Sequence, residues 1–229
     1  MKTIGLLGGM SWESTTSYYR ILNEAVRERL GGLHSAKLCL HSVEFGEVES
    51  LMAAGNWDAV TGILKEAAGK LETAGSDFIL ICTNTMHKLA PEIQKSLSIP
   101  ILHIGDATAE ALTRDGVKCA GLLGTRPTME QDFCRDRIER KGIKIITPSE
   151  PDMDFVQEVI FSELCAGVFK EESRKRFQEI MAYMVEAGAE GIILGCTEIP
   201  LLVEQRHASV KLYDTTQLHA LAAVERALS

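Results

Sequence analysis

The sequence has no pair of cysteines at a spacing that suits a zinc ribbon or a redox dithiol. Its six cysteines, at positions 39, 82, 119, 134, 165 and 196, lie far apart, and no C-x-x-C pair occurs. No apolar stretch approaches the roughly 18 residues that a membrane helix requires. The short apolar run from Ile4 to Met10 is soon followed by Glu13 and lacks a small-residue cleavage site, so it is not a signal peptide. We therefore expect a cytoplasmic protein whose cysteines stay reduced, and any cysteine that takes part in chemistry acts as a single thiol.

Basic residues and nucleotide-binding motifs are also scarce. The chain has 24 Lys and Arg against 32 Asp and Glu, a net charge of −8, which argues against nucleic acid or an anionic membrane as a partner. The Gly8-Gly9 turn lacks the G-x-G-x-x-G spacing, and no G-x-x-x-x-G-K-[ST] string is present. With 229 residues, of which 45% are hydrophobic, the chain can form one large domain or two small ones, each with its own core.

Short runs typical of strands alternate with segments of helical period along the whole chain. Such alternation predicts an α/β fold with mostly parallel sheets. Several of the runs are apolar without alternation, as expected for strands covered by helices on both faces. The predicted strands are 3–8, 37–43, 78–82, 99–104, 118–123, 143–147, 191–195 and 210–213.

An internal repeat divides the chain into similar halves. The string Gly5-Leu6-Leu7-Gly8-Gly9 returns as Gly121-Leu122-Leu123-Gly124-Thr125, 116 residues later. The string that starts at Ala74 returns from Ala187, 113 residues later. We therefore predict two pseudo-symmetric, four-stranded α/β domains, 1–115 and 116–213. The last segment, 214–229, opens with Asp214-x-x-Gln217, a helix-start signature, and is expected to pack on the first domain.

Ligands of open α/β sheets bind beyond the carboxyl ends of the strands, so the repeated turns there are the candidate site. Each turn offers backbone N–H groups and small polar side chains to an anion. A small molecule with a carboxylate fits these turns best. The four turns are Gly8-Gly9-Met10-Ser11, Cys82-Thr83-Asn84-Thr85, Gly124-Thr125-Arg126-Pro127-Thr128 and Gly195-Cys196-Thr197-Glu198.

Cys196 is the cysteine in these turns whose position favours chemistry. It follows a predicted strand and precedes a predicted helix start, where the pKa of a thiol can fall from about 8.5 toward neutrality. The repeat places Thr83 opposite it, since 196 lies 113 residues after 83. Neighbouring side chains of a strand point to opposite faces, so Cys82 is expected to face away from the site.

The turns resemble those of the aspartate/glutamate racemase family over essentially the whole chain. The matching strings are those from Ile4 to Met10, from Asn84 to His87 and from Gly195 to Glu198, together with the string from Gly121 to Thr125. The resemblance implies two α/β domains with the active site in the cleft between them, no cofactor and no metal, a small amino acid as substrate, and often a homodimer. Two cysteines of such enzymes act on opposite faces of the substrate α-carbon.

The first of these cysteines is replaced here, because Thr83-Asn84-Thr85 stands where the family usually has Cys-Asn-Thr. A hydroxyl is a poorer base than a thiol but can still relay a proton. We therefore expect Cys196 to take the α-proton of the L enantiomer and the Thr83 side to return a proton. The threonine resembles that of a subgroup selective for L-aspartate or L-glutamate.

The substrate carboxylate must be held by N–H groups and hydroxyls while charge develops on the α-carbon. His87 and His103 could order the site, and Arg126 is either a reader of a side-chain carboxylate or a surface charge. The segment Val43-Glu44-Phe45 lacks an arginine, which leaves the choice between aspartate and glutamate open. The candidate binding residues are Met10, Ser11, Asn84, Thr85, Thr125, Thr128, Thr197 and Glu198.

Two other functions are compatible with a single reactive cysteine. One is a lyase like arylmalonate decarboxylase, in which Cys196 protonates a carbanion, although the polar turns suit an aryl group poorly. The other is a non-catalytic amino-acid-binding protein. An activated Cys196 should react with an alkylating reagent near neutral pH, whereas the thiol of a binding protein should not.

Overall fold

The computed structural model describes residues 1–229, which form two compact units. The first unit comprises Met1–Ile104 and His219–Ser229, and the second comprises Gly105–Leu218. The sequence placed the boundaries at 115 and 213, so the two differ over the helix that spans Ile104–Arg114. None of the helices combines the length and the apolar character that crossing a membrane requires.

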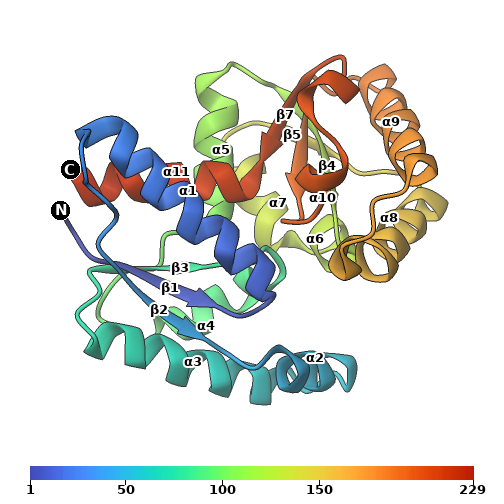
Figure 1. The fold of residues 1–229 in the computed structure, drawn as a ribbon. Helices are drawn as coiled ribbons and strands as arrows, with labels where there is room; N and C mark the ends of the chain where they lie inside the picture. Colours follow the sequence, from blue (N-terminus) through green and yellow to red (C-terminus); the bar gives the residue numbers. More distant parts are fainter. The chain divides into compact units, whose positions relative to one another are not determined.

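The first unit is a parallel sheet with helices on both faces (Figure 1). Its strand order is β2-β1-β3. Buried side chains of α1 and of the end of α11 pack on one face of the sheet, and those of α3 and α4 pack on the other. The elements up to Gln94 are β1 (Ile4–Gly8), α1 (Trp12–Leu30), β2 (Leu38–Ser42), α2 (Phe45–Ala53), α3 (Trp57–Thr73), β3 (Phe78–Ile81), the 3-10 helix η1 (Thr85–Leu89) and α4 (Ala90–Gln94).

The predicted fourth strand of this unit, 99–104, is wrong: the sheet has three strands and one isolated bridge between Ile79 and Ile101. Two hydrogen bonds form there, from Ile79 N–H to the Pro100 carbonyl at 3.0 Å and from Leu102 N–H to the Ile79 carbonyl at 2.9 Å. Pairing stops on one side because Pro100 has no N–H to donate. On the other side, the Leu102 carbonyl accepts a hydrogen bond from His219 Nε2 at 2.8 Å.

The second unit has the four parallel strands that the sequence predicts, in the order β5-β4-β6-β7. Its sheet is also covered on both faces, by α8 and α9 on one and by α5 and α7 on the other (Figure 1). The elements are α5 (Ile104–Arg114), β4 (Cys119–Gly124), α6 (Arg126–Glu130), α7 (Asp132–Glu139), β5 (Lys144–Ile146), α8 (Glu150–Ser162), η2 (Leu164–Ala166), α9 (Glu171–Glu186), β6 (Gly191–Gly195), α10 (Ile199–Leu202), η3 (Gln205–His207), β7 (Lys211–Asp214) and α11 (Thr215–Leu228).

The strand register confirms the internal repeat. In the first unit Leu7 of β1 lies opposite Ile81 of β3. In the second unit Leu123 of β4 lies opposite Leu194 of β6. These are the same positions after shifts of 116 and 113 residues, so the two sheets pair their central strands in the same register. The two units are therefore repeats of one parallel-sheet plan.

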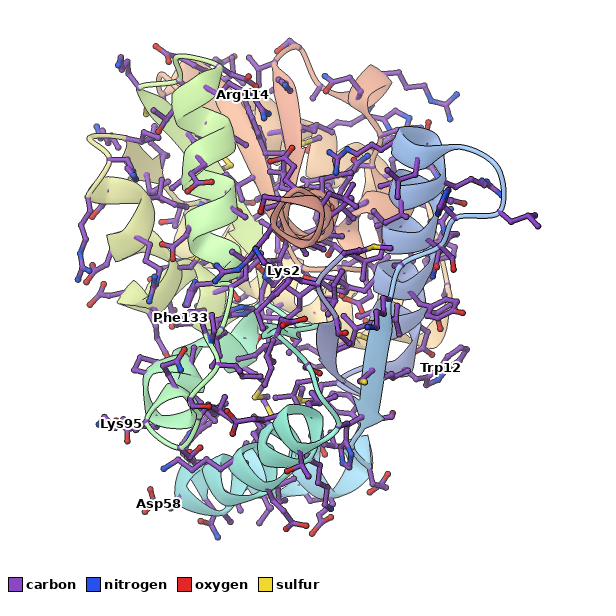
Figure 2. All side chains as sticks on the ribbon, turned by 90° about the vertical axis from the view of Figure 1, so that its left-hand side faces the viewer. Lys2, Trp12, Asp58, Lys95, Arg114 and Phe133 are labelled. Atoms are coloured by element: carbon purple, nitrogen blue, oxygen red, sulfur yellow. The ribbon has the colours of Figure 1, made fainter.

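The last helix starts as its sequence predicts. The Asp214 carboxylate accepts hydrogen bonds from the backbone N–H groups of Thr216 and Gln217, at 2.8 and 3.2 Å, and so caps α11. From Ala220 onward its buried residues pack with Ile4 and Leu6 of the first unit. Lys2 lies beside the end of this helix (Figure 2), and its backbone N–H donates to the Ala227 carbonyl at 2.9 Å.

Gly9, in the turn after β1, is held in a conformation that only glycine adopts easily. Its φ is +91°, and an added Cβ would collide with the Val43 carbonyl oxygen and lie 2.7 Å from the Val43 nitrogen. Both neighbours are backbone atoms, which cannot swing aside. The turn that carries Met10 and Ser11 therefore depends on glycine at this position.

Replacement of this glycine should destabilise the fold. We expect Gly9→Ala to lower the free energy of unfolding by about 1–3 kcal/mol, because strain and collision act together. The control is Gly62→Ala in α3, where an added Cβ meets no atom within 4 Å. There, higher helix propensity should raise the free energy of unfolding by about 0.5–1 kcal/mol. Urea titration of both variants measures the difference, and equal midpoints would contradict it.

Candidate functional site

In the first unit, the predicted site residues follow two neighbouring strands. The Cys82 N–H donates to the Leu7 carbonyl at 2.9 Å, which brings the ends of β3 and β1 together. Beyond β1, the Gly9 N–H donates to Thr15 Oγ1 at 2.8 Å, which folds the turn back on α1. The turns that carry Met10–Ser11 and Thr83–Thr85 therefore lie at one edge of the sheet, as the sequence predicts.

The side chains of these turns differ in what they offer. Met10 is buried in the core under α3, so its backbone rather than its side chain is available. Ser11 caps α1 by accepting a hydrogen bond from Ser14 N–H at 3.4 Å. Asn84 is buried directly before η1, whereas Thr83 and Thr85 are partly exposed.

In the second unit, the turns after β4 and β6 approach closely. A Cβ on Gly124 would lie 2.9 Å from the Gly195 carbonyl oxygen, and a Cβ on Gly195 would lie 2.9 Å from the Leu123 oxygen. Thr128 is fully buried against both glycines, and its Oγ1 lies 3.1 Å from Thr125 Oγ1. Thr128 thus positions Thr125, while α6 begins at Arg126 rather than at Thr128 as its spacing to Gln131 suggested.

Cys196 and Glu198 form a buried thiol–carboxylate pair. The Cys196 thiol donates to Glu198 Oε2 across 3.0 Å, and Thr197 Oγ1 donates to the same oxygen at 2.6 Å. The residues Cys196 and Glu198 are 7% and 8% exposed. The sequence placed Glu198 among the substrate-binding residues, but these contacts point to a different task, because a carboxylate beside a thiol is a proton acceptor for it.

The expected lowering of the Cys196 pKa is wrong. Burial raises this pKa well above its ordinary value, and the nearby negative charge of Glu198, which also accepts the thiol hydrogen bond, raises it further. The helix expected to oppose this, α10, has only four residues, from Ile199 to Leu202. The thiol is therefore protonated at neutral pH, and slow alkylation there would not distinguish an enzyme from a binding protein.

Cys82 lies in a different environment from Cys196. It is fully buried in the core on the α1 side of the first sheet. Burial alone raises the pKa of its thiol far above the usual range. A thiolate at this position is strongly disfavoured, so Thr83 is the residue at this strand end that the register aligns with Cys196.

His87 connects the Thr83 turn to a buried ring cluster. Its Nδ1 lies 2.7 Å from the Thr83 carbonyl, and its Nε2 lies 3.2 Å from the donating N–H of Ile104. The His103 ring packs edge-on at 4.5 Å between centroids. Sequence reasoning noted both histidines but missed His219, whose ring centroid lies 5.4 Å from that of His87, because no local pattern connects positions so far apart.

Arg126 is engaged by acidic neighbours and by the Gln157 side chain. Their carboxylates raise the pKa of its guanidinium, whose charge is thereby matched within the second unit. This favours the surface-charge alternative over the reading of a substrate carboxylate. Its partners are Glu130, Glu150 and Asp154 through the guanidinium and Gln157 through the backbone N–H. No group of three or more His, Cys, Asp or Glu side chains is arranged to hold a metal ion.

Comparisons with known proteins agree with this geometry. A family model described as Asp/Glu/Hydantoin racemase matches residues 7–223. A candidate Asp/Glu racemase from Yersinia pestis is 49% identical, with a TM-score of 0.95 over 100% of both chains. An aspartate racemase homologue from Pyrococcus horikoshii OT3 is 34% identical, with a TM-score of 0.88 over 100% of both chains. The broad specificity amino-acid racemase RacX of Bacillus subtilis (strain 168) is 26% identical over 75% of this chain and 74% of its own.

The thiol–carboxylate pair predicts how Cys196 titrates. Glu198→Gln removes the charge and the hydrogen-bond acceptor that hold the proton on Cys196, so the thiol pKa should fall, although burial keeps it above its ordinary value. The measurement is the pH dependence of thiolate absorbance, taken as the difference from Cys196→Ala. Glu186→Gln, at an exposed position at the end of α9, is the control and should leave the titration unchanged. A rise of the pKa in Glu198→Gln would contradict the pairing.

Proposed function

Because the chain belongs to the Asp/Glu/hydantoin racemase family, we propose that it is a cofactor-independent amino acid racemase that acts on L-aspartate, L-glutamate or both. The observation that carries the assignment of residues is the shared strand register. Thr83 lies two residues after Ile81 and Cys196 two after Leu194, and these strand positions are equivalent in the two sheets. One half of the repeat thus offers a thiol where the other offers a hydroxyl.

Proton abstraction begins at the Cys196–Glu198 pair. The Glu198 carboxylate accepts the thiol proton, and the resulting thiolate removes the α-proton of the L enantiomer, forming an S–H bond and leaving the electron pair on the α-carbon. The raised pKa of Cys196 makes its thiolate a stronger base than an ordinary one, once the proton has moved. Glu198 then releases its proton to solvent, which restores the starting charge of the pair.

Proton return occurs from the Thr83 side. The Thr83 hydroxyl donates a proton to the opposite face of the α-carbon and is itself reprotonated by water, so that atoms and charge balance. A hydroxyl is too weak an acid to lose its proton at neutral pH unless a stronger base takes it, and the carbanion is such a base. The reverse reaction requires the hydroxyl to remove an α-proton, which is harder. The proposed enzyme therefore turns over the L enantiomer faster than the D enantiomer.

Charge that develops on the substrate must meet fixed donors. We assign this task to Asn84, Thr85, Thr125 and Thr197, with the backbone of Met10 and Ser11, because these groups lie at the carboxyl edges of the two sheets. Thr128 acts through Thr125, to which its hydroxyl is bonded. As the family resemblance implies, we also propose a homodimer as the active form.

The direct test follows the α-proton of each enantiomer of aspartate and glutamate by proton NMR in D₂O. The proposal predicts loss of the α-proton signal of the L form, with the D form appearing, in wild type but not in Cys196→Ala. Absence of exchange with both amino acids would reject this substrate class. The non-catalytic binding protein would then become the better account.

A lyase like arylmalonate decarboxylase remains the second candidate, favoured by one observation. Cys196 is the cysteine in the strand-end turns whose thiol has a proton acceptor, so the geometry offers a single thiol as proton donor. Release of CO₂ from an arylmalonate by wild type, without racemisation of aspartate or glutamate, would establish this reaction instead.

A thiol introduced opposite Cys196 in the repeat should change the direction of preference. We expect Thr83→Cys to raise turnover of the D enantiomer by at least about tenfold, because a thiol is a far better base than a hydroxyl. Thr85→Cys is the matched control, since this threonine is also partly exposed in the same turn, and it should not raise D turnover. The measurement is the initial rate with each enantiomer. An unchanged D rate in Thr83→Cys would contradict the role of this position.

A further inference from the structure

Four ring side chains form a buried cluster in the first unit, next to the Thr83 turn. Tyr18, His87 and His219 are fully buried, and His103 is 4% exposed. The His87 ring centroid lies 4.5 Å from that of His103 and 5.4 Å from that of His219, and Tyr18 lies 5.6 Å from His219. Three buried histidines are costly to fold unless their nitrogens are satisfied. The hydrogen bonds therefore deserve to be followed atom by atom.

The bonding partners fix the proton positions of two rings. A carbonyl can only accept, so His87 Nδ1, 2.7 Å from the Thr83 oxygen, carries a proton. A backbone N–H can only donate, so His87 Nε2, which faces the N–H of Ile104 at 3.2 Å, carries none. By the same rule His219 carries its proton on Nε2, toward the Leu102 carbonyl. Its Nδ1 then accepts from the Tyr18 hydroxyl at 2.8 Å. Both rings are neutral.

His87 holds two consecutive carbonyls of the turn. Its side chain donates to the Thr83 carbonyl, and its backbone N–H donates to the Asn84 carbonyl at 3.0 Å. The other side of the ring is anchored to Ile104, at the start of α5. The peptide that follows Thr83 is thus clamped to a rigid, buried group. Because the orientation of this peptide sets the direction of the Thr83 side chain, the clamp acts on the hydroxyl through the backbone.

The second unit lacks this clamp and has another device in its place. Position 87 corresponds to Pro200 after the 113-residue shift, and Glu198 corresponds to Thr85. Thus the cysteine turn has a carboxylate that touches the thiol, and the threonine turn has a histidine that touches the backbone. The difference matches the chemistry of the two groups. A thiol must lose its proton to become a base, whereas a hydroxyl that relays a proton must be held in the correct direction.

We propose that His87 is a positioning residue that orients Thr83 for proton return through its Nδ1–H bond to the Thr83 carbonyl. This inference rests on the proposed function for its activity readout. It assigns separate tasks to the two nitrogens of His87. The Nδ1–H serves Thr83 and the reaction, and Nε2 serves Ile104 and the stability of the fold.

Two substitutions separate the nitrogens. The amide of His87→Asn can place its NH₂ near the position of Nδ1 and keep the bond to Thr83. The longer side chain of His87→Gln reaches the Nε2 position, where its oxygen accepts from Ile104 and the bond to Thr83 is lost. Tyr18→Phe is the control for the stability of the cluster. It removes the bond to His219 and leaves both contacts of His87 in place.

The activity arm measures racemisation and α-proton exchange of L-aspartate and L-glutamate in D₂O. We expect His87→Gln to lower kcat for racemisation by roughly ten- to a hundredfold with little change of KM. Exchange through Cys196 should continue, so the ratio of exchange with retention to inversion rises. His87→Asn and Tyr18→Phe should keep the wild-type ratio. Equal losses in His87→Asn and His87→Gln, or an unchanged ratio in His87→Gln, would overturn the proposal.

A second arm does not depend on racemase activity. In a Thr83→Cys background, the rate at which iodoacetamide modifies position 83 reports the placement of that side chain. It should change when His87→Gln is added and stay the same when His87→Asn or Tyr18→Phe is added. Equal rates in all four proteins would overturn the positioning role even if the wild type racemises. Conversely, a change specific to His87→Gln in a protein that racemises neither amino acid would support the clamp and reject the proposed function.

Discussion

The pairing of each central strand with its neighbour is the constraint on which the candidate site depends. Parallel pairing brings the carboxyl ends of β1 and β3 together in the first unit, and those of β4 and β6 in the second. Contacts at the second pair are so close that only glycine fits at positions 124 and 195. A one-residue slip would turn every side chain of a strand to the other face, so the register decides which residue leaves each strand at its end. In one sheet that residue is Thr83, and in the other it is Cys196.

The same scaffold thus presents two unlike groups, and their surroundings differ accordingly. Around Cys196, burial and the Glu198 carboxylate keep the proton on sulfur until a carboxylate takes it. Around Thr83, a neutral histidine holds the backbone and leaves the hydroxyl of Thr83 unchanged in charge. A symmetric scaffold with asymmetric groups explains why the proposed enzyme should prefer one enantiomer, since the harder proton transfer falls to the weaker base.

Much of the fold could be predicted because it depends on local sequence and on repetition. The strands at 4–8, 38–42 and 191–195 were recognisable from short apolar runs, and the equivalence of Thr83 with Cys196 followed from one shift of 113 residues. The missing fourth strand of the first sheet could not be predicted, because His219, far away in sequence, takes the carbonyl that the next rung requires. The direction of the Cys196 pKa was also beyond local reasoning. It depends on burial and on where the Glu198 side chain turns, and neither can be read from a strand–helix pattern.

The measurement that tests this account most directly is α-proton exchange of L-aspartate and L-glutamate in D₂O by Thr83→Val. Valine has nearly the shape of threonine but no hydroxyl, so the variant removes the proposed proton donor with little change in packing. The account predicts that the variant still exchanges the α-proton of the L form through Cys196, with retained configuration, while the D form no longer appears. Racemisation at the wild-type rate, or loss of exchange together with racemisation, would contradict the division of tasks between Thr83 and Cys196.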